Sequence, residues 1–186
     1  MTPELAEIIR EAIESRLIDV HTALPGEVVA VDAVTRTAEI RPLLTRWLEK
    51  EDGSFIQENL PVIPNVKNLE IRGLNFFVSV PVEVGTTGLL IFSEASLDIW
   101  RQKNQVSPPG DVGRHTLTGA VFLPGLFAAG EELPTQPTDA LVVGHKNGTV
   151  VTIESDTIKG ENSSGDFELK SSGQFSVNSG TFTVDP

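Results

Sequence analysis

The sequence lacks cysteine and tyrosine, and it is poor in basic residues. Without cysteine the chain can form no disulfide and no thiolate metal site. Its 14 lysine and arginine residues stand against 26 acidic ones, which gives a formal net charge of −12. A charge of this sign repels phosphate backbones, so we expect no nucleic acid among the partners.

Long apolar runs are missing as well. The first seven residues are acidic and lack the apolar centre of a secretory signal. No run approaches the roughly 18 apolar residues that a membrane helix needs. We therefore expect the chain to be made in the cytoplasm without a signal peptide.

The sequence also lacks the common catalytic motifs. It has no G-x-S-x-G, no H-E-x-x-H, no P-loop and no dinucleotide fingerprint, and its three histidines form no pair at ligand spacing. Two of the three carboxylates Glu70, Glu94 and Asp98 could form a pair for glycoside hydrolysis, but any acidic chain offers such candidates. We expect no enzyme, no catalytic residue, no bound metal and no cofactor.

Residues 1–19 are predicted to form a helix. Thr2 can cap it and Pro3 suits its first position. An apolar stripe follows at spacings of three and four, formed by Leu5, Ile8, Ile9, Ala12, Ile13 and Leu17. The helix packs either on its own chain or on a neighbouring subunit, and the pattern leaves both possibilities open.

Residues 20–127 carry β signals. Residues 26–32 and 37–41 alternate apolar and polar side chains around a turn, and further short apolar segments are separated by glycine and proline turns. These segments are residues 46–48, 55–56, 62–63, 76–80, 88–92 and 118–125. Some five strands in about 100 residues suit a small closed barrel such as the OB-fold, and a small sandwich fits nearly as well.

A linker at 128–139 leads to a segment of different composition at 140–186. Large side chains become sparse there, and serine, glycine and asparagine dominate. Serine recurs every eight residues at Ser155, Ser163, Ser171 and Ser179, and pairs of apolar residues recur with it. Each unit is predicted to be a short strand with one apolar face, followed by a turn. The unit at 156–162 keeps the length but breaks the apolar phase.

The repeat predicts a needle that several chains build together. A strand with two inward apolar residues forms no core alone, whereas stacked strands from three chains close one within this short length. We therefore predict an intertwined, triple-stranded β-helix in a homotrimer. Its core residues are Val151, Ile153, Phe167, Leu169, Phe175, Val177, Phe182 and Val184. A flexible Ser/Gly linker is the alternative, but linkers do not repeat an aromatic and an aliphatic residue in register.

Two further stretches, residues 82–100 and 113–126, carry a family resemblance. The first contains S-x-D-x-W after a strand, and the second contains R-H-x-L-x-x-A-x-F-x-P-G-L just before the repeats. These stretches occur in a chain with the order helix, barrel, linker and eight-residue repeats. In both respects the chain resembles the central spike of contractile phage tails and related injection systems, and it is similar to baseplate assembly protein V.

The resemblance implies a structural protein of the virion baseplate. Its barrel would attach to tail hub proteins, and its β-helix would pierce the host outer membrane when the sheath contracts. Some such spikes have a histidine-rich apex that binds iron, which this sequence lacks. Either the sequence stops before such an apex, or a separate tip protein covers the C-terminal end. Two alternatives remain: a trimeric tail-fibre or adhesin module that binds surface glycan, and a wall-degrading hydrolase.

Overall fold

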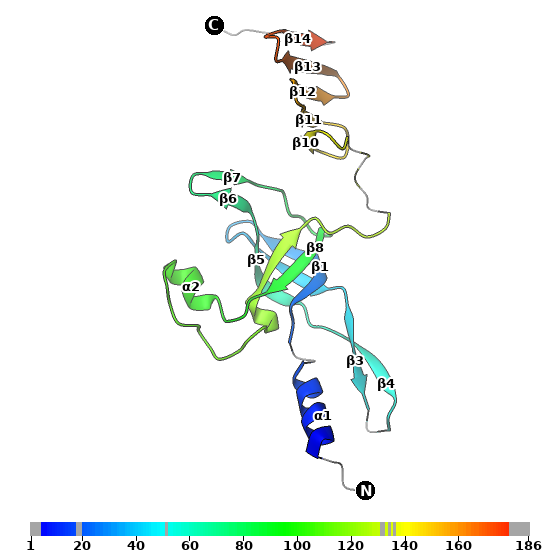
Figure 1. The fold of residues 1–186 in the computed structure, drawn as a ribbon, viewed down its shortest axis with the longest axis vertical. Helices are drawn as coiled ribbons and strands as arrows, with labels where there is room; N and C mark the ends of the chain where they lie inside the picture. Colours follow the sequence, from blue (N-terminus) through cyan, green and yellow to red (C-terminus); the bar gives the residue numbers. More distant parts are fainter. Residues whose placement is uncertain are drawn as a thin grey trace. The chain divides into compact units, whose positions relative to one another are not determined.

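The computed structural model describes residues 5–17, 20–50, 52–130, 133, 135 and 137–178. The protein is mainly β with one short N-terminal helix, and it divides into two compact units, Met1–Phe127 and Ala128–Pro186 (Figure 1). The elements of the first unit are α1 (Leu5–Leu17), β1 (Ala23–Asp32), β2 (Thr37–Pro42), β3 (Thr45–Glu49), β4 (Phe55–Asn59), β5 (Ile63–Asn68), β6 (Ile71–Gly73), β7 (Phe76–Val78), β8 (Thr87–Phe92), α2 (Asp98–Lys103), the 3₁₀ turn η1 (Leu117–Gly119) and β9 (Ala120–Pro124). Those of the second are β10 (Leu141–Gly144), β11 (Val150–Ile153), β12 (Thr157–Asn162), β13 (Gly165–Lys170) and β14 (Phe175–Asn178).

Five strands of the first unit close into a barrel in the order β1-β2-β5-β9-β8. The β5–β9 pair is parallel and the other four pairs are antiparallel. Closure removes the free sheet edges, and this order is that of a small OB-fold-like barrel. The predicted barrel is therefore confirmed, and a sandwich is excluded.

The barrel core is formed by inward side chains from all five strands. Its buried members are Val28, Ala38, Ile40, Ile63, Val66, Leu90, Phe92, Ala120 and Phe122. Phe122 and Leu90 lie opposite each other in the β8–β9 ladder, and both are completely buried. Burying each such side chain contributes about 1.5–3 kcal/mol, so this cluster is the main source of stability in the first unit.

Two hairpins of the first unit lie outside the barrel. The strands β3 and β4 pair only with each other, and so do β6 and β7 (Figure 1). Every residue of β4, β6 and β7 is exposed. Of the segments predicted as short strands, residues 46–48, 55–56 and 76–80 therefore lie in or next to the free hairpins and contribute no barrel strand.

The second unit is one antiparallel sheet in which β10 to β14 follow one another in order. Two of its connections use the same turn, at residues 145–149 and 170–174. In each the fourth residue is a glycine with positive φ, Gly148 at 95° and Gly173 at 82°. A type I turn followed by such a glycine fits the twist of a hairpin. Gly148 and Gly173 therefore mark two points where the chain reverses.

Consecutive strands of this sheet hydrogen-bond to each other within one chain. The predicted intertwining of three chains stays a prediction. The terminal residues 179–186, which include Phe182 and Val184 of the predicted needle core, lie outside the described residues.

Candidate functional surface

The β10–β14 sheet has one continuous apolar face. Residues opposite each other in an antiparallel ladder project to the same side of the sheet, so the register defines two columns on this face. One column is Leu141, Ile153, Ile158, Leu169 and Phe175, and the other is Val143, Val151, Gly160, Phe167 and Val177. The nine residues other than glycine remain 38% to 61% exposed. One sheet thus exposes to solvent an apolar strip that is two side chains wide.

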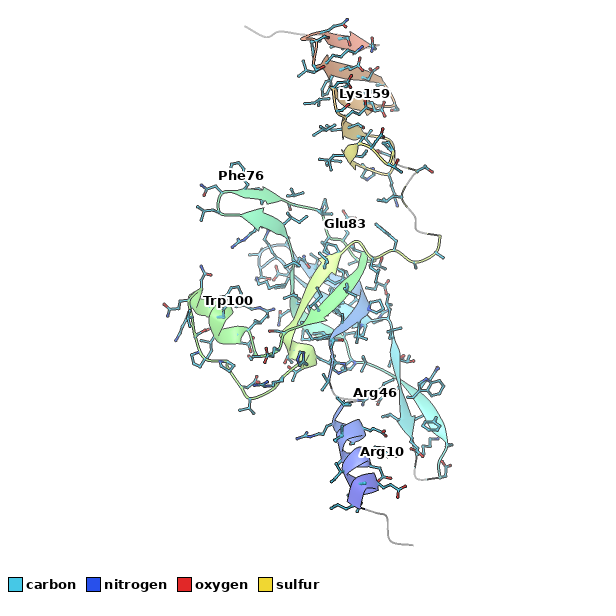
Figure 2. The ribbon with its side chains drawn as sticks, in the orientation of Figure 1. Arg10, Arg46, Phe76, Glu83, Trp100 and Lys159 are labelled. Carbon is cyan, nitrogen blue, oxygen red and sulfur yellow. The ribbon has the colours of Figure 1, made fainter. Side chains whose placement is uncertain are left out.

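The opposite face of the same sheet is largely polar and charged. Lys159 forms an ion pair with Glu161 beside it on β12, and Lys170 binds Glu168 at 3.1 Å. The hydrogen bond from Lys159 to Glu161 raises the pKa of the lysine above its usual value, although burial acts in the other direction. Figure 2 labels Lys159 on this sheet. Because side chains alternate along each strand, the sheet has one uncharged face and one charged face.

Gly160 is the one position in the two columns without a side chain. A Cβ placed there would lie 2.3 Å from the ring of Phe167, its partner across the ladder. The ring therefore covers the glycine backbone, an arrangement known to compensate for glycine in a strand. The rings of Phe167 and Phe175 lie 6.4 Å apart at 39°, within the range of favourable aromatic pairs.

Six of the eight predicted needle-core residues lie in the two columns. They are Val151, Ile153, Phe167, Leu169, Phe175 and Val177. The sequence suggested that the apolar phase breaks at 156–162. The structure keeps the phase, because Ile158 and Gly160 take the two positions of β12 on the apolar face. Sequence analysis missed Ile158 and also Leu141 and Val143. Leu141 and Val143 alternate with other residues but precede the serine-rich repeats, and Ile158 alternates with a glycine instead of a second apolar residue.

The first unit exposes apolar side chains on its two free hairpins. On β6–β7, Leu74, Phe76 and Phe77 are 103%, 84% and 68% exposed, and Figure 2 labels Phe76 there. On β3–β4, Trp47 and Phe55 are 60% and 61% exposed. Single exposed apolar residues are ordinary, whereas contiguous exposed apolar patches mark interaction surfaces.

The three carboxylates considered for catalysis are each held by a local partner. Glu70 pairs with Arg36 at 3.2 Å, and Glu94 pairs with Arg114 at 3.2 Å. The carboxylate of Asp98 accepts a hydrogen bond from the Ser96 hydroxyl at 3.4 Å. These contacts give the three groups separate structural roles on the surface.

No group of three or more metal-ligating side chains occurs among the described residues. Within the same part of the chain, no helix has the length and apolar character needed to cross a membrane.

Comparison with known proteins gives one family. The family model described as the phage protein Gp138 N-terminal domain matches residues 24–125, which contain the barrel except for the first residue of β1, and both free hairpins. No curated protein matches the chain. Because the matched segment covers more than half of the 186 residues, the chain belongs to the phage protein Gp138 N-terminal domain family.

Proposed function

We propose that this protein is the central spike of a contractile phage tail or a related injection system. Membership of a phage protein family supports a tail or baseplate role. The observation that carries the finer proposal is the exposed apolar face of the β10–β14 sheet. Exposing such an apolar face to water is unfavourable, and we propose that further copies of the chain cover it.

In the proposed assembly three chains place their apolar faces around a common axis. Each sheet brings two apolar columns and turns its charged face outward, so the three sheets enclose a dry core. Because the ladders form within one chain, a three-sided prism with one sheet per chain is favoured over strands that alternate between chains. The number three comes from the resemblance to central spikes, and two facing sheets are the competing arrangement.

The proposed role is mechanical and non-enzymatic. The barrel attaches to tail hub and baseplate proteins, and the needle is driven through the host outer membrane. Five units at about 4.8 Å per strand give a needle of roughly 24 Å, shorter than the hydrocarbon core of about 30 Å. The proposal also includes a separate tip protein as a further partner, because the edges of a sheet invite the addition of another chain.

The exposed aromatic hairpins favour a second candidate function, that of a trimeric glycan-binding module of a tail fibre. Phe76 and Trp47 could stack on sugar rings, and their exposure is what this reading requires. Binding of purified protein to a bacterial surface-glycan array, lost in Phe76→Ala, would favour it. Retained hub association together with absent glycan binding would favour the spike.

Electron cryomicroscopy of purified particles tests the spike proposal. We expect threefold density for the barrel on the tail axis beneath the hub, ending in a three-sided needle. Density for this chain on a peripheral fibre, or its absence from the particle, would overturn the proposal.

A further inference from the structure

The helix α1 presents an apolar face that its own chain leaves uncovered. None of its 13 residues is buried. Ile9, Ala12, Ile13 and Leu17 line a shallow apolar groove along the helix, and Arg16 lies among them. A helix with one apolar side is normally stabilised by packing that side on a partner. The partner must also accommodate the guanidinium group of Arg16.

The β3–β4 hairpin presents a surface of matching chemistry. In its ladder Trp47 lies opposite Gln57 and Phe55 lies opposite Glu49, so these four side chains share one face. Both aromatic residues are more than half exposed. The face is therefore aromatic with a single carboxylate, as the helix face is aliphatic with a single guanidinium group.

The charges on the two faces are available for each other. Among the residues that the structure describes, neither Arg16 nor Glu49 forms an ion pair within the chain, whereas Arg46 on the other side of the hairpin is bound to Glu58 at 2.5 Å. An arginine and a carboxylate that meet at the edge of an apolar contact form a directional, charge-assisted pair. The lengths agree too, because 13 helical residues span about 20 Å and five strand residues about 17 Å.

The other exposed surfaces fit α1 less well. On the β6–β7 hairpin, Arg72 and Phe77 share one face and would set a second cation against Arg16. The opposite face of that hairpin, with Ile71 and Phe76, carries no carboxylate. Self-association of α1 about a threefold axis would gather three Arg16 side chains in one layer, and like charges at such proximity are destabilising.

We propose that α1 of one subunit packs on the Trp47–Phe55 face of the β3–β4 hairpin of a second copy, with Arg16 paired to Glu49. This inference rests on the proposed homotrimer, which supplies the second copy. The contact would link adjacent subunits outside the needle and would give the exposed hairpin a structural role. It also decides between the two positions that the sequence allowed for the helix.

Cysteine cross-linking tests the contact cleanly, because the native sequence contains no cysteine. The variant Ile13→Cys/Phe55→Cys is oxidised in its native state and separated on a denaturing gel. We expect cross-linked dimers and trimers, which disappear on reduction. A disulfide within one chain, shown by intact monomer mass and peptide mapping, would overturn the proposal. So would the absence of any cross-link.

Matched controls exclude random collision. The pair Ile13→Cys/Phe76→Cys places the second thiol on the other exposed hairpin, and we expect at least tenfold less cross-linking. Equal yields would overturn the proposal. Each single variant must stay monomeric on the gel, since an Ile13→Cys homodimer would show that the helices meet one another instead.

A charge exchange tests the pairing of Arg16 and Glu49. In the Ile13→Cys/Phe55→Cys background, Arg16→Glu should slow cross-linking several-fold, and adding Glu49→Arg should restore it. A double exchange no faster than Arg16→Glu alone would overturn the pairing. The native mass of each sample is measured before oxidation: an oligomer without cross-links refutes only this contact, whereas a monomeric wild type refutes the proposed trimer.

Discussion

A charge placed on the apolar face of the needle should prevent assembly, and the same charge on the opposite face should not. Val151 and Thr152 are neighbours on β11 that project to opposite sides of the sheet. Val151 lies opposite Gly160 in an apolar column, and Thr152 lies opposite Lys159 on the charged face. The substitutions Val151→Asp and Thr152→Asp therefore differ in little except which face receives the carboxylate.

The expected effect of Val151→Asp is large. Val151 is 41% exposed in the single chain, so covering it in the assembly contributes about 1 kcal/mol per subunit, which the variant loses. A carboxylate buried without a partner costs several kcal/mol more per ion. Three copies together lose on the order of 10 kcal/mol, enough to abolish assembly at micromolar concentration. Thr152→Asp adds a charge beside Lys159 in solvent and should change assembly by less than about 1 kcal/mol.

Sedimentation velocity at neutral pH measures both variants against the wild type. We expect a monomer for Val151→Asp, with the barrel still folded by circular dichroism, and an oligomer for Thr152→Asp. Because burial raises the pKa of a carboxyl group, lowering the pH should neutralise the new aspartate and restore part of the assembly. Equal oligomer content in the two variants would refute the assignment of the inward face.

Three further predictions concern the first unit. Phe122→Ala should lower the free energy of unfolding of the barrel by about 3–5 kcal/mol in urea, whereas Phe76→Ala, 84% exposed, should change it by less than about 0.5 kcal/mol; equal losses would contradict the core assignment. Gly88→Ala should cost about 1–3 kcal/mol because its Cβ would lie 2.4 Å from a backbone oxygen, while Gly73→Ala meets no atom within 4 Å and serves as the control. Hydrogen bonds from the turn residues Thr35 and Val34 lower the pKa of Asp32. The contribution of the Asp32 carboxylate to the free energy of unfolding is therefore complete above the ordinary pKa of 3.8, and it is lost as the pH falls through the lowered pKa. Asp32→Asn keeps an acceptor oxygen without the charge, and its melting temperature should fall less than that of the wild type between about pH 4 and pH 2; parallel pH profiles would contradict this role.

The barrel was predictable because its signals are local. Turn residues bounded the strands, and the alternation in 26–32 and 37–41 gave the first hairpin that the ladder confirms. The roles of β3–β4 and β6–β7 were not predictable, because strands such as Phe76–Val78 have the composition of barrel strands. Only the closure of the barrel, a long-range property, shows that no place remains for them.

The apolar face of the β10–β14 sheet was predicted in part for a similar reason. Phe167 and Phe175 stood out because an aromatic residue repeats at an interval of eight. Gly160 was missed because a search for apolar side chains does not detect a glycine. The apolar surface at this position comes from the ring of Phe167 on the next strand. The proposed docking of α1 could not be derived from its stripe alone. It required the register of β3–β4, which places Glu49 beside the two aromatic residues.

The native mass of the protein tests the central claim most directly. Three chains of 20.0 kDa give an oligomer of about 60 kDa. Light scattering coupled to size exclusion, repeated over a hundredfold range of protein concentration, should give this mass throughout. A folded monomer near 20 kDa would show that the apolar face of the β10–β14 sheet needs no further copies, and would contradict the account.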